Sequence, residues 1–502
     1  MSRKLWKCAT PFIILVFFVG ILIWLTFLGI LYMFGNVGIE VIAIQLRMPL
    51  TGVDSRYYVN FFLLLLFVVL LSVLFGIYLW KSFSQERLFC VKASLARGIL
   101  TGAAFFLLGS SLVTLDMKYE LYDFLFRDQN YYTYFEDNYY MPRVDEIVAK
   151  GEVNNLVLLI LESVEDTVND PVLFDPILMP RMLEMKKKGI SFSRRFDVVG
   201  TAVSIQSFYS SMMGVPVGWV DYKQILGKGL NIKGEAVRDP IDFDPARGPV
   251  FHDLSLVGIL EQKGYDIIFF CAADSAFSSY DKFFGVATKH TDIRDFPYFV
   301  SKYGDKLKDE EKNSWGVNDS FLLRQVKEYL TERVDERPFV VIIQTVNTHE
   351  PGYYEKNLPR PYGDYRDACV QVDIMASDFV KWIFEQPMGK NTTLAFYGDH
   401  CFGFEHFGSV AVPSKSKRKI MTALLNSRHG EQGTEIDKLC AMWDFTPTFL
   451  EAIGFTVPGR RFGLGTSLFS SEQTLLQKDG MERYNYLFKK RSKLYEDTYA
   501  IW

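Results

Sequence analysis

The stretch Asn155-Leu-Val-Leu-Leu-Ile-Leu-Glu-Ser163 is a short, unbroken apolar run that ends on a carboxylate. A run this short and rich in Val, Ile and Leu is typical of a strand buried on both faces, as in a parallel sheet. In open α/β sheets the ligand crevice lies just outside the carboxyl ends of the strands. Glu162 therefore lies either at the rim of an active site or on a solvated loop.

Strand and helix patterns alternate from about Val153 to the C-terminus. We expect further strands at Asp266–Phe270, Phe339–Thr345, Thr392–Tyr397 and Ile420–Leu425. Apolar residues at helical spacing predict helices at Met179–Lys188, Leu254–Lys263, Asp319–Arg333 and Asp367–Glu385. The alternation predicts one large, doubly wound α/β domain over residues 151–502. Residues 221–253 are rich in Gly, Pro and Asp, which predicts a long loop over the site.

The N-terminal residues 1–117 predict a membrane domain with about three transmembrane helices. Residues 12–34 and 58–80 are uncharged runs long enough to cross a bilayer, and residues 98–115 form a shorter third run. A cleaved signal peptide is the alternative for the first run. The run is too long for that, and no small-x-small cleavage site follows it. We interpret it as a retained anchor.

The basic residues predict the orientation of these spans. They gather before the first span and between the second and third, at Arg3, Lys4, Lys7, Lys81, Arg87, Lys92 and Arg97. Such regions stay in the cytoplasm. We therefore expect a multi-pass protein of the bacterial cytoplasmic (inner) membrane, with the catalytic domain in the periplasm or outside.

Residues 118–150 are crowded with aromatic side chains and predict a juxtamembrane linker. Tyrosine favours the membrane interface, so a helix on the bilayer surface is one interpretation. A segment packed on the catalytic domain is the other. Cys271, Cys369, Cys401 and Cys440 would lie outside the cytoplasm, as one or two disulfides or as buried thiols. The net charge of −4 and the lack of a basic tract argue against nucleic acid as a partner, and the oligomeric state stays open.

Polar residues of catalytic type follow the predicted strands. His349 comes just after Phe339–Thr345, and Asp399 and His400 follow Thr392–Tyr397. Thr201 follows the first strand and helix. The same edge of a parallel sheet would gather these residues with Glu162. Taken singly, Thr201 is equally a helix N-cap, His349 a loop histidine and Asp399 a turn residue.

Two carboxylates, an imidazole and a hydroxyl can hold one divalent ion, Mn²⁺ or Zn²⁺, with Mg²⁺ as a further candidate. A hydroxyl on such an ion loses its proton readily and becomes a nucleophile at neutral pH. A phosphate diester is a suitable target. His349 is placed to bind the phosphate or to protonate a leaving oxygen, and Ser204, Glu405 and His406 are further candidates for substrate binding.

The sequence resembles the sulfatase-like family of membrane-anchored transferases, which includes lipoteichoic acid synthases, phosphoglycerol transferases and phosphoethanolamine transferases. The matching motifs are Leu161-Glu162-Ser163; Gly200-Thr201-Ala202-Val203-Ser204 with Gly214-Val215-Pro216; Trp315-Gly316-Val317-Asn318-Asp319; Thr348-His349; Gly398-Asp399-His400; and Pro447-Thr448-Phe449-Leu450 with Gly463-Leu464-Gly465. The resemblance implies an alkaline-phosphatase/sulfatase-like fold. It also implies Glu162, Thr201, Asp399 and His400 as metal ligands, Thr201 as nucleophile and His349 as phosphate ligand.

The departures from the family pattern narrow the range of reactions expected for this chain. Thr201 and its neighbours lack the Pro and Arg of sulfatases, which argues against hydrolysis of sulfate esters. Ser275 and Phe277 stand where lipoteichoic acid synthases have Trp and Arg, and Ile205–Gln206 stands where phosphoethanolamine transferases often have Pro-Cys. The motifs at Trp315 and Gly463 favour the phosphoglycerol branch.

The resemblance therefore predicts a phosphotransferase that acts through a covalent threonine intermediate. It would move phosphoglycerol from phosphatidylglycerol, a membrane phospholipid, to a glycan or glycolipid of the cell envelope. The alternatives are phosphoethanolamine transfer to lipopolysaccharide or another envelope glycan, a phosphodiesterase of the same fold, and a non-enzymatic envelope protein. The sequence does not identify the acceptor or the metal.

Overall fold

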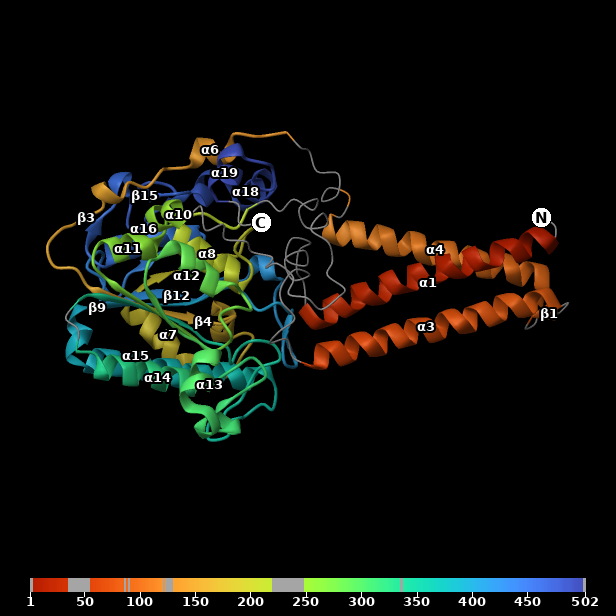
Figure 1. Ribbon diagram of the computed structural model, residues 1–502, viewed down its shortest axis with the longest axis horizontal. Helices are drawn as coiled ribbons and strands as arrows, with labels where there is room; N and C mark the ends of the chain where they lie inside the picture. The colour runs from red at the N-terminus through yellow and green to blue at the C-terminus, as the bar shows by residue number, and fades with distance from the viewer. Residues whose placement is uncertain are drawn as a thin grey trace. The chain divides into compact units, whose positions relative to one another are not determined.

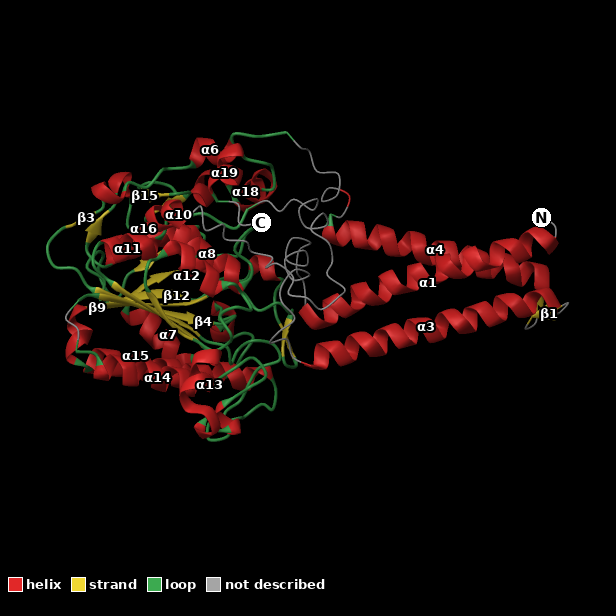
Figure 2. Cartoon of the chain, viewed as in Figure 1, coloured by secondary structure: helices red, strands yellow, loops and turns green. Residues whose placement is uncertain are grey.

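The computed structural model describes residues 3–34, 55–84, 87–88, 91–120, 122, 130–218, 248–334 and 337–499. The chain divides into two compact units, residues 1–43 with 53–127, and residues 44–52 with 128–502 (Figures 1 and 2). Most of the predicted loop 221–253 lies outside the described residues.

The described part of the first unit contains three long apolar helices, α1 (Arg3–Phe34), α3 (Ser55–Ser84) and α4 (Ala93–Tyr119), with a short antiparallel pair, β1 (Arg87–Leu88) and β2 (Val91–Lys92). Among the described residues, three stretches are long and apolar enough to cross a membrane: Ala9–Leu31, Phe62–Ser82 and Ala93–Tyr119. They contain most of each span predicted from the sequence.

The side chains of these helices suit a lipid environment. Ile13, Phe75 and Ala104, one from each helix, pack in a shared buried cluster. Phe12 and Phe106 instead lie 58% and 77% exposed on the outer surfaces of α1 and α4. Contiguous exposed apolar surface is costly in water and stable against acyl chains. The chain is therefore membrane-anchored, as predicted.

The second unit is built on an eight-stranded mixed sheet with the strand order β13-β5-β12-β9-β4-β8-β6-β7. Five neighbours, β9 to β7 in this order, run parallel, whereas β12 is antiparallel to both β9 and β5. In sheet order the bounds are β13 (Glu435–Ile436), β5 (Ile190–Phe192), β12 (Thr422–Leu425), β9 (Thr392–Gly398), β4 (Asn155–Leu161), β8 (Phe339–Gln344), β6 (Asp266–Cys271) and β7 (Thr291–Arg294).

Strand β4 lies between two buried layers, and its side chains alternate between them. Leu156, Leu158 and Ile160 join one hydrophobic cluster, and Val157 and Leu159 join the other. One layer is covered by α7 (Pro180–Lys188), α13 (Phe296–Tyr303), α14 (Asp319–Glu332) and α15 (Tyr365–Glu385) (Figure 1). The other is covered by α8 (Ser204–Met213), α10 (Gly248–Leu254), α11 (Leu256–Gln262), α12 (Tyr280–Ala287) and α16 (Phe445–Ala452).

Two details differ from the sequence prediction, and one alternative that it left open is decided. Residues 248–253 belong to helix α10 and not to a loop, so the predicted loop was wrong there. Strands β5, β7 and β13 were not predicted, because each has at most four residues and none lies in a longer apolar run of the sequence. The four cysteines of this unit are buried free thiols and form no disulfide.

From Asn130 onward the aromatic segment packs on the C-terminal helices. It contains α6 (Tyr134–Asn138), and its Phe135 ring lies 5.2 Å from the ring of Tyr495 and 5.3 Å from that of Tyr139. The C-terminal helices are α17 (Leu475–Asp479), α18 (Met481–Phe488) and α19 (Lys493–Thr498). For this described part of the predicted linker, the structure agrees with packing on the domain.

Candidate metal centre and active site

The strand register brings Glu162 and Asp399 together. Leu161, the last residue of β4, pairs in parallel with Gly398, the last residue of β9. The next residue of each strand, Glu162 and Asp399, therefore leaves the sheet at the same point. Both side chains are buried, with Glu162 4% and Asp399 1% exposed.

Gly398 is required by the close approach of the chain beneath the site. A Cβ atom at this position would lie 1.7 Å from the carbonyl oxygen of Val164, which is backbone and cannot swing aside. The glycine therefore lets the turn that carries Asp399 pack directly on the turn that follows Glu162.

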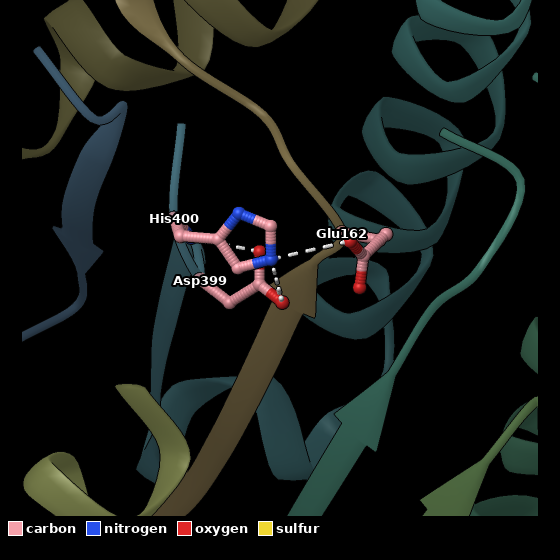
Figure 3. A group of neighbouring side chains, drawn as sticks. All are labelled: Glu162, Asp399 and His400. Carbon is pink, nitrogen blue, oxygen red and sulfur yellow. Dashed lines mark hydrogen bonds and ion pairs between the residues drawn. The ribbon is translucent and has the colours of Figure 1, made fainter. Parts of the chain in front are cut away.

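His400 completes a cluster with the two carboxylates (Figure 3). Its Nε2 atom lies 3.4 Å from Oε1 of Glu162 and 3.7 Å from Oδ2 of Asp399. Within the described part of the chain, one ligand atom from each of the three residues lies within 4.8 Å of the other two. Two ligands of one ion are separated by at most twice a bond of about 2.0–2.2 Å, so a small inward movement would let all three bind a single cation.

The three side chains stabilise positive charge at their centre. Burial raises the pKa of Glu162, but the hydrogen bond and positive charge of His400 outweigh it and hold that pKa well below its usual range. Burial and the charge of Glu162 raise the pKa of Asp399 to about 7. Burial lowers the pKa of His400, yet the two carboxylates reverse the effect and raise it to about 9. A divalent cation supplies the same compensation as the proton on His400.

The orientation of His400 also fits a metal ligand. Its Nδ1 atom lies 2.9 Å from the carbonyl oxygen of Cys401, to which an Nδ1–H group donates. In the neutral ring this leaves the Nε2 lone pair directed at the carboxylates. The donor set of imidazole and two carboxylates is therefore suited to Zn²⁺ or Mn²⁺.

Two hydroxyl residues lie on the segment that enters α8, and they differ in position. The hydroxyl of Ser204 donates to Oε2 of Glu162 at 3.1 Å and lies 3.3 Å from Nε2 of His400. The hydroxyl of Thr201 instead donates to the carbonyl oxygen of Val198 at 3.0 Å and accepts from the Val198 N–H at 3.1 Å. The structure thus gathers Ser204 with the cluster, while Thr201, 2% exposed, is held by its own turn.

Ser163 ties the two carboxylates together and was missed by sequence reasoning. Its N–H donates to Asp399 Oδ1 and its hydroxyl to Glu162 Oε1, both at 2.8 Å. These bonds hold Ser163 at φ 54°, a left-handed conformation that costs a non-glycine residue about 1–2 kcal/mol. Strain of this kind is common at functional sites. No local sequence signal marks it.

Arg195 supports the other side of the cluster from beneath. Its guanidinium donates to the carbonyl oxygens of Gly398 and Asp399, each at 2.8 Å, and its side chain is 1% exposed. The group lies against the rings of Tyr397 and Phe445 at 5.4 and 5.6 Å. These contacts fix the turn that presents Asp399 and His400.

His349 lies near the cluster and beside an aromatic wall. Its positive form would lower the pKa of Glu162, and its ring centroid lies 4.5 Å from that of Trp315. Nδ1 lies 3.0 Å from the carbonyl oxygen of Glu350, so Nε2 is the nitrogen left for a substrate. Asp319 holds this loop by accepting from the Val346 and Asn347 N–H groups at 2.8 and 3.2 Å.

Glu405 and His406 are exposed on the short hairpin of β10 (His406–Phe407) and β11 (Val410–Ala411). Neither belongs to the cluster of ligand atoms among the described residues. The sequence prediction of a substrate role for them stays a prediction.

The sulfatase family model matches residues 154–455, more than half of the chain. The chain belongs to the sulfatase family. The family and the alkaline-phosphatase/sulfatase-like α/β fold expected from the motifs are thereby confirmed, and a divalent metal is typical of this fold.

A relative of this sulfatase-family chain is phosphoglycerol transferase I of Citrobacter koseri. It is 26% identical over 267 residues, which are 49% of this chain but only 30% of the relative. Two solved structures are similar in fold. A protein of the alkaline phosphatase superfamily from Vibrio parahaemolyticus has a TM-score of 0.48 at 19% identity, with 62% of this chain and 68% of that chain covered. The lipoteichoic acid synthase LtaP from Listeria monocytogenes has a TM-score of 0.46 at 16% identity, with 65% and 80% covered.

Proposed function

We propose that the chain is a membrane-anchored phosphotransferase that moves phosphoglycerol from phosphatidylglycerol to a glycan or glycolipid of the cell envelope. The buried cluster of Glu162, Asp399 and His400, with two hydroxyl residues on the adjoining segment, carries the proposal. The relationship to phosphoglycerol transferase I supports the choice of the transferred group. The three apolar helices support a donor that resides in the membrane.

Glu162, Asp399 and His400 would hold the divalent ion, Zn²⁺ or Mn²⁺, with Thr201 as a fourth ligand. When bound, the ion supplies positive charge and lowers the pKa of a neighbouring hydroxyl. Thr201 must leave Val198 to reach the cluster, and rotation about its Cα–Cβ bond gives its hydroxyl a new direction. Ser204 holds the side chains of Glu162 and His400 in place relative to each other through its two contacts.

In the first step the Thr201 hydroxyl gives up its proton to solvent, its oxygen forms a bond to phosphorus, and the bond from phosphorus to the diacylglycerol oxygen breaks. The leaving oxygen takes a proton, which Nε2 of a protonated His349 would supply. Diacylglycerol departs and phosphoglyceryl-Thr201 remains. In the second step a sugar hydroxyl of the acceptor attacks the same phosphorus and gives its proton to His349. The bond from phosphorus to the Thr201 oxygen breaks, and that oxygen takes up a proton from solvent, which restores the Thr201 hydroxyl.

The basic residues at the N-terminus and between the second and third apolar helices support a cytoplasmic location for those regions. The catalytic unit would then lie in the periplasm or on the outer surface of a bacterial cytoplasmic membrane. A donor lipid in the outer leaflet would be accessible to it.

Peptide mass spectrometry tests the proposal. The full chain is incubated with phosphatidylglycerol and Zn²⁺ or Mn²⁺ in the absence of acceptor, and a phosphoglycerol adduct on Thr201 is the expected result. A phosphoethanolamine adduct formed only from phosphatidylethanolamine would overturn the donor. Release of glycerol phosphate into water without an adduct would instead favour a phosphodiesterase.

A further inference from the structure

A lysine from a distant loop reaches the segment that carries Thr201. Lys415 begins a short 3-10 helix, Lys415–Lys417, more than two hundred residues after Thr201. Its ammonium donates to the carbonyl oxygen of Ala202 at 2.9 Å and lies 3.3 Å from Oδ2 of Asp197. The side chain of Lys415 is 15% exposed and that of Asp197 is 5% exposed.

Asp197 connects this lysine to the residue that follows His400. The same Oδ2 atom accepts from the N–H of Cys401 at 2.9 Å. Asp197 lies four residues before Thr201, Ala202 directly after it, and Cys401 directly after His400. The ion pair of Lys415 and Asp197 therefore joins the Thr201 turn, the His400 turn and the loop of Lys415 in one network.

Stability alone is a poor reason for this network. Oδ1 of Asp197 is buried without a hydrogen-bond partner among the residues that the structure describes, and a buried polar atom left in this way is destabilising. Taking two charges out of water is costly, and apolar residues in place of a buried pair often stabilise a fold equally well. A buried ion pair that adds little stability is better explained by a role in positioning the segments that it joins.

We propose that the pair of Lys415 and Asp197 is a positioning device that fixes the Thr201 turn relative to His400. The inference rests on the proposed function, in which the Thr201 oxygen must meet phosphorus held beside the metal cluster. When Lys415 is lost, the Ala202 carbonyl loses its donor and Asp197 keeps a buried, unpaired charge. Both changes displace the turn, and a shift of about 1 Å in a reacting group can cost about 100-fold in rate.

The test compares Lys415→Met, Lys415→Arg and Lys417→Met in the full chain. Lys417 is the matched control because it lies on the same short helix and is exposed. Three quantities are measured: the rate of Thr201 adduct formation from phosphatidylglycerol, the binding of Zn²⁺ by calorimetry, and amide hydrogen exchange over residues 196–204. The Thr201 amide is informative because it donates to the Val198 carbonyl oxygen at 3.0 Å.

We expect Lys415→Met to lower the maximal rate of adduct formation about 100-fold, with little change in lipid KM or zinc binding, and to speed exchange at residues 196–204. Lys415→Arg should recover much of the rate, because it retains the charge. Lys417→Met should match the wild type in all three measurements. Lys415→Met in combination with Asp197→Asn should be less impaired in exchange than Lys415→Met alone, because the unpaired charge is gone.

Equal rates and equal exchange in Lys415→Met and Lys417→Met would overturn the inference. A loss of rate explained wholly by weaker zinc binding, with unchanged exchange at residues 196–204, would also overturn it. If the wild type forms no adduct, the proposed function fails, and the exchange measurement still decides whether the pair holds the turn.

Discussion

Replacement of Thr201 and of Ser204 should have very different effects on the covalent step. The two hydroxyl residues lie three positions apart, and the structure places the Ser204 hydroxyl between Glu162 and His400 while Thr201 is bonded to Val198. The family motif nevertheless makes Thr201 the proposed nucleophile. Thr201→Ala, Thr201→Ser and Ser204→Ala therefore test whether the nucleophile is the residue that the family motif indicates or the hydroxyl that contacts Glu162 and His400.

The contacts of Ser204 set the size of its expected effect. Its hydroxyl makes one hydrogen bond to a charged carboxylate and one contact to His400, and removal of a bond to a charged group costs about 1.5–3 kcal/mol. If all of this were lost in the transition state, the rate would fall by about 10–200-fold. Ser204→Ala should thus slow the reaction within this range and still place the adduct on Thr201. Thr201→Ala removes the attacking oxygen and should abolish the adduct.

Thr201→Ser is the matched control, because it keeps the hydroxyl and removes one methyl group, a change of about 0.8 kcal/mol in burial. It should form the adduct at a rate within about tenfold of the wild type. The assay is time-resolved peptide mass spectrometry with phosphatidylglycerol and zinc. An adduct on Ser204 in the wild type, or undiminished adduct formation by Thr201→Ala, would refute the assignment of Thr201.

Three further predictions concern the metal and the fold. Removal of divalent ions by a chelator should stop adduct formation, and Zn²⁺ or Mn²⁺ should restore it; a chelated protein with full activity would contradict the metal site. The ion at 100 times its Kd should raise the free energy of unfolding by about 2.7 kcal/mol, and Asp399→Asn should largely remove this increase. Gly398→Ala should lower the free energy of unfolding by several kcal/mol in a denaturant titration, because its Cβ would meet the Val164 carbonyl oxygen at 1.7 Å. The control is Gly285→Ala, which lies in an open position on α12 and should raise the free energy of unfolding by up to about 1 kcal/mol. Burial raises the pKa of Asp444 to about 7, so its contribution to stability is present below the unfolded pKa near 4 and is lost as pH rises through 7. The free energy of unfolding, measured at a series of pH values, should decline by up to about 1.4 kcal/mol per pH unit because of this group. This decline should be absent in Asp444→Asn.

The fold was largely predictable because its central strands carry their own signal. The apolar run at Asn155–Leu161 is continuous because both faces of β4 are buried, and β6, β8 and β9 show the same pattern. Short edge strands lack such a pattern. In β7 none of the four residues is fully buried, and β13 has only two residues, so neither stands out from loop sequence.

The cluster could be predicted to the extent that it depends on register. Glu162 and Asp399 each follow the last residue of a parallel strand, and backbone pairing alone then brings them together. The positions of side chains on loops do not follow from this rule. The roles of Ser163, Arg195 and Lys415 depend on turns whose course is set by packing with segments far away in the sequence, and the sequence near each residue contains no mark of it.

The difference between Thr201 and Ser204 follows from the protein partners that each hydroxyl has. Glu162 and Asp399 concentrate negative charge beside α8, and the Ser204 hydroxyl can donate to it directly. Thr201 finds equivalent partners in the Val198 backbone, at no cost in unsatisfied groups. A divalent ion changes this balance, because it prefers oxygen lone pairs over O–H donors and would favour an approach of Thr201. Metal binding and the position of the nucleophile should therefore be linked, and the Thr201 amide should exchange at different rates with and without the ion.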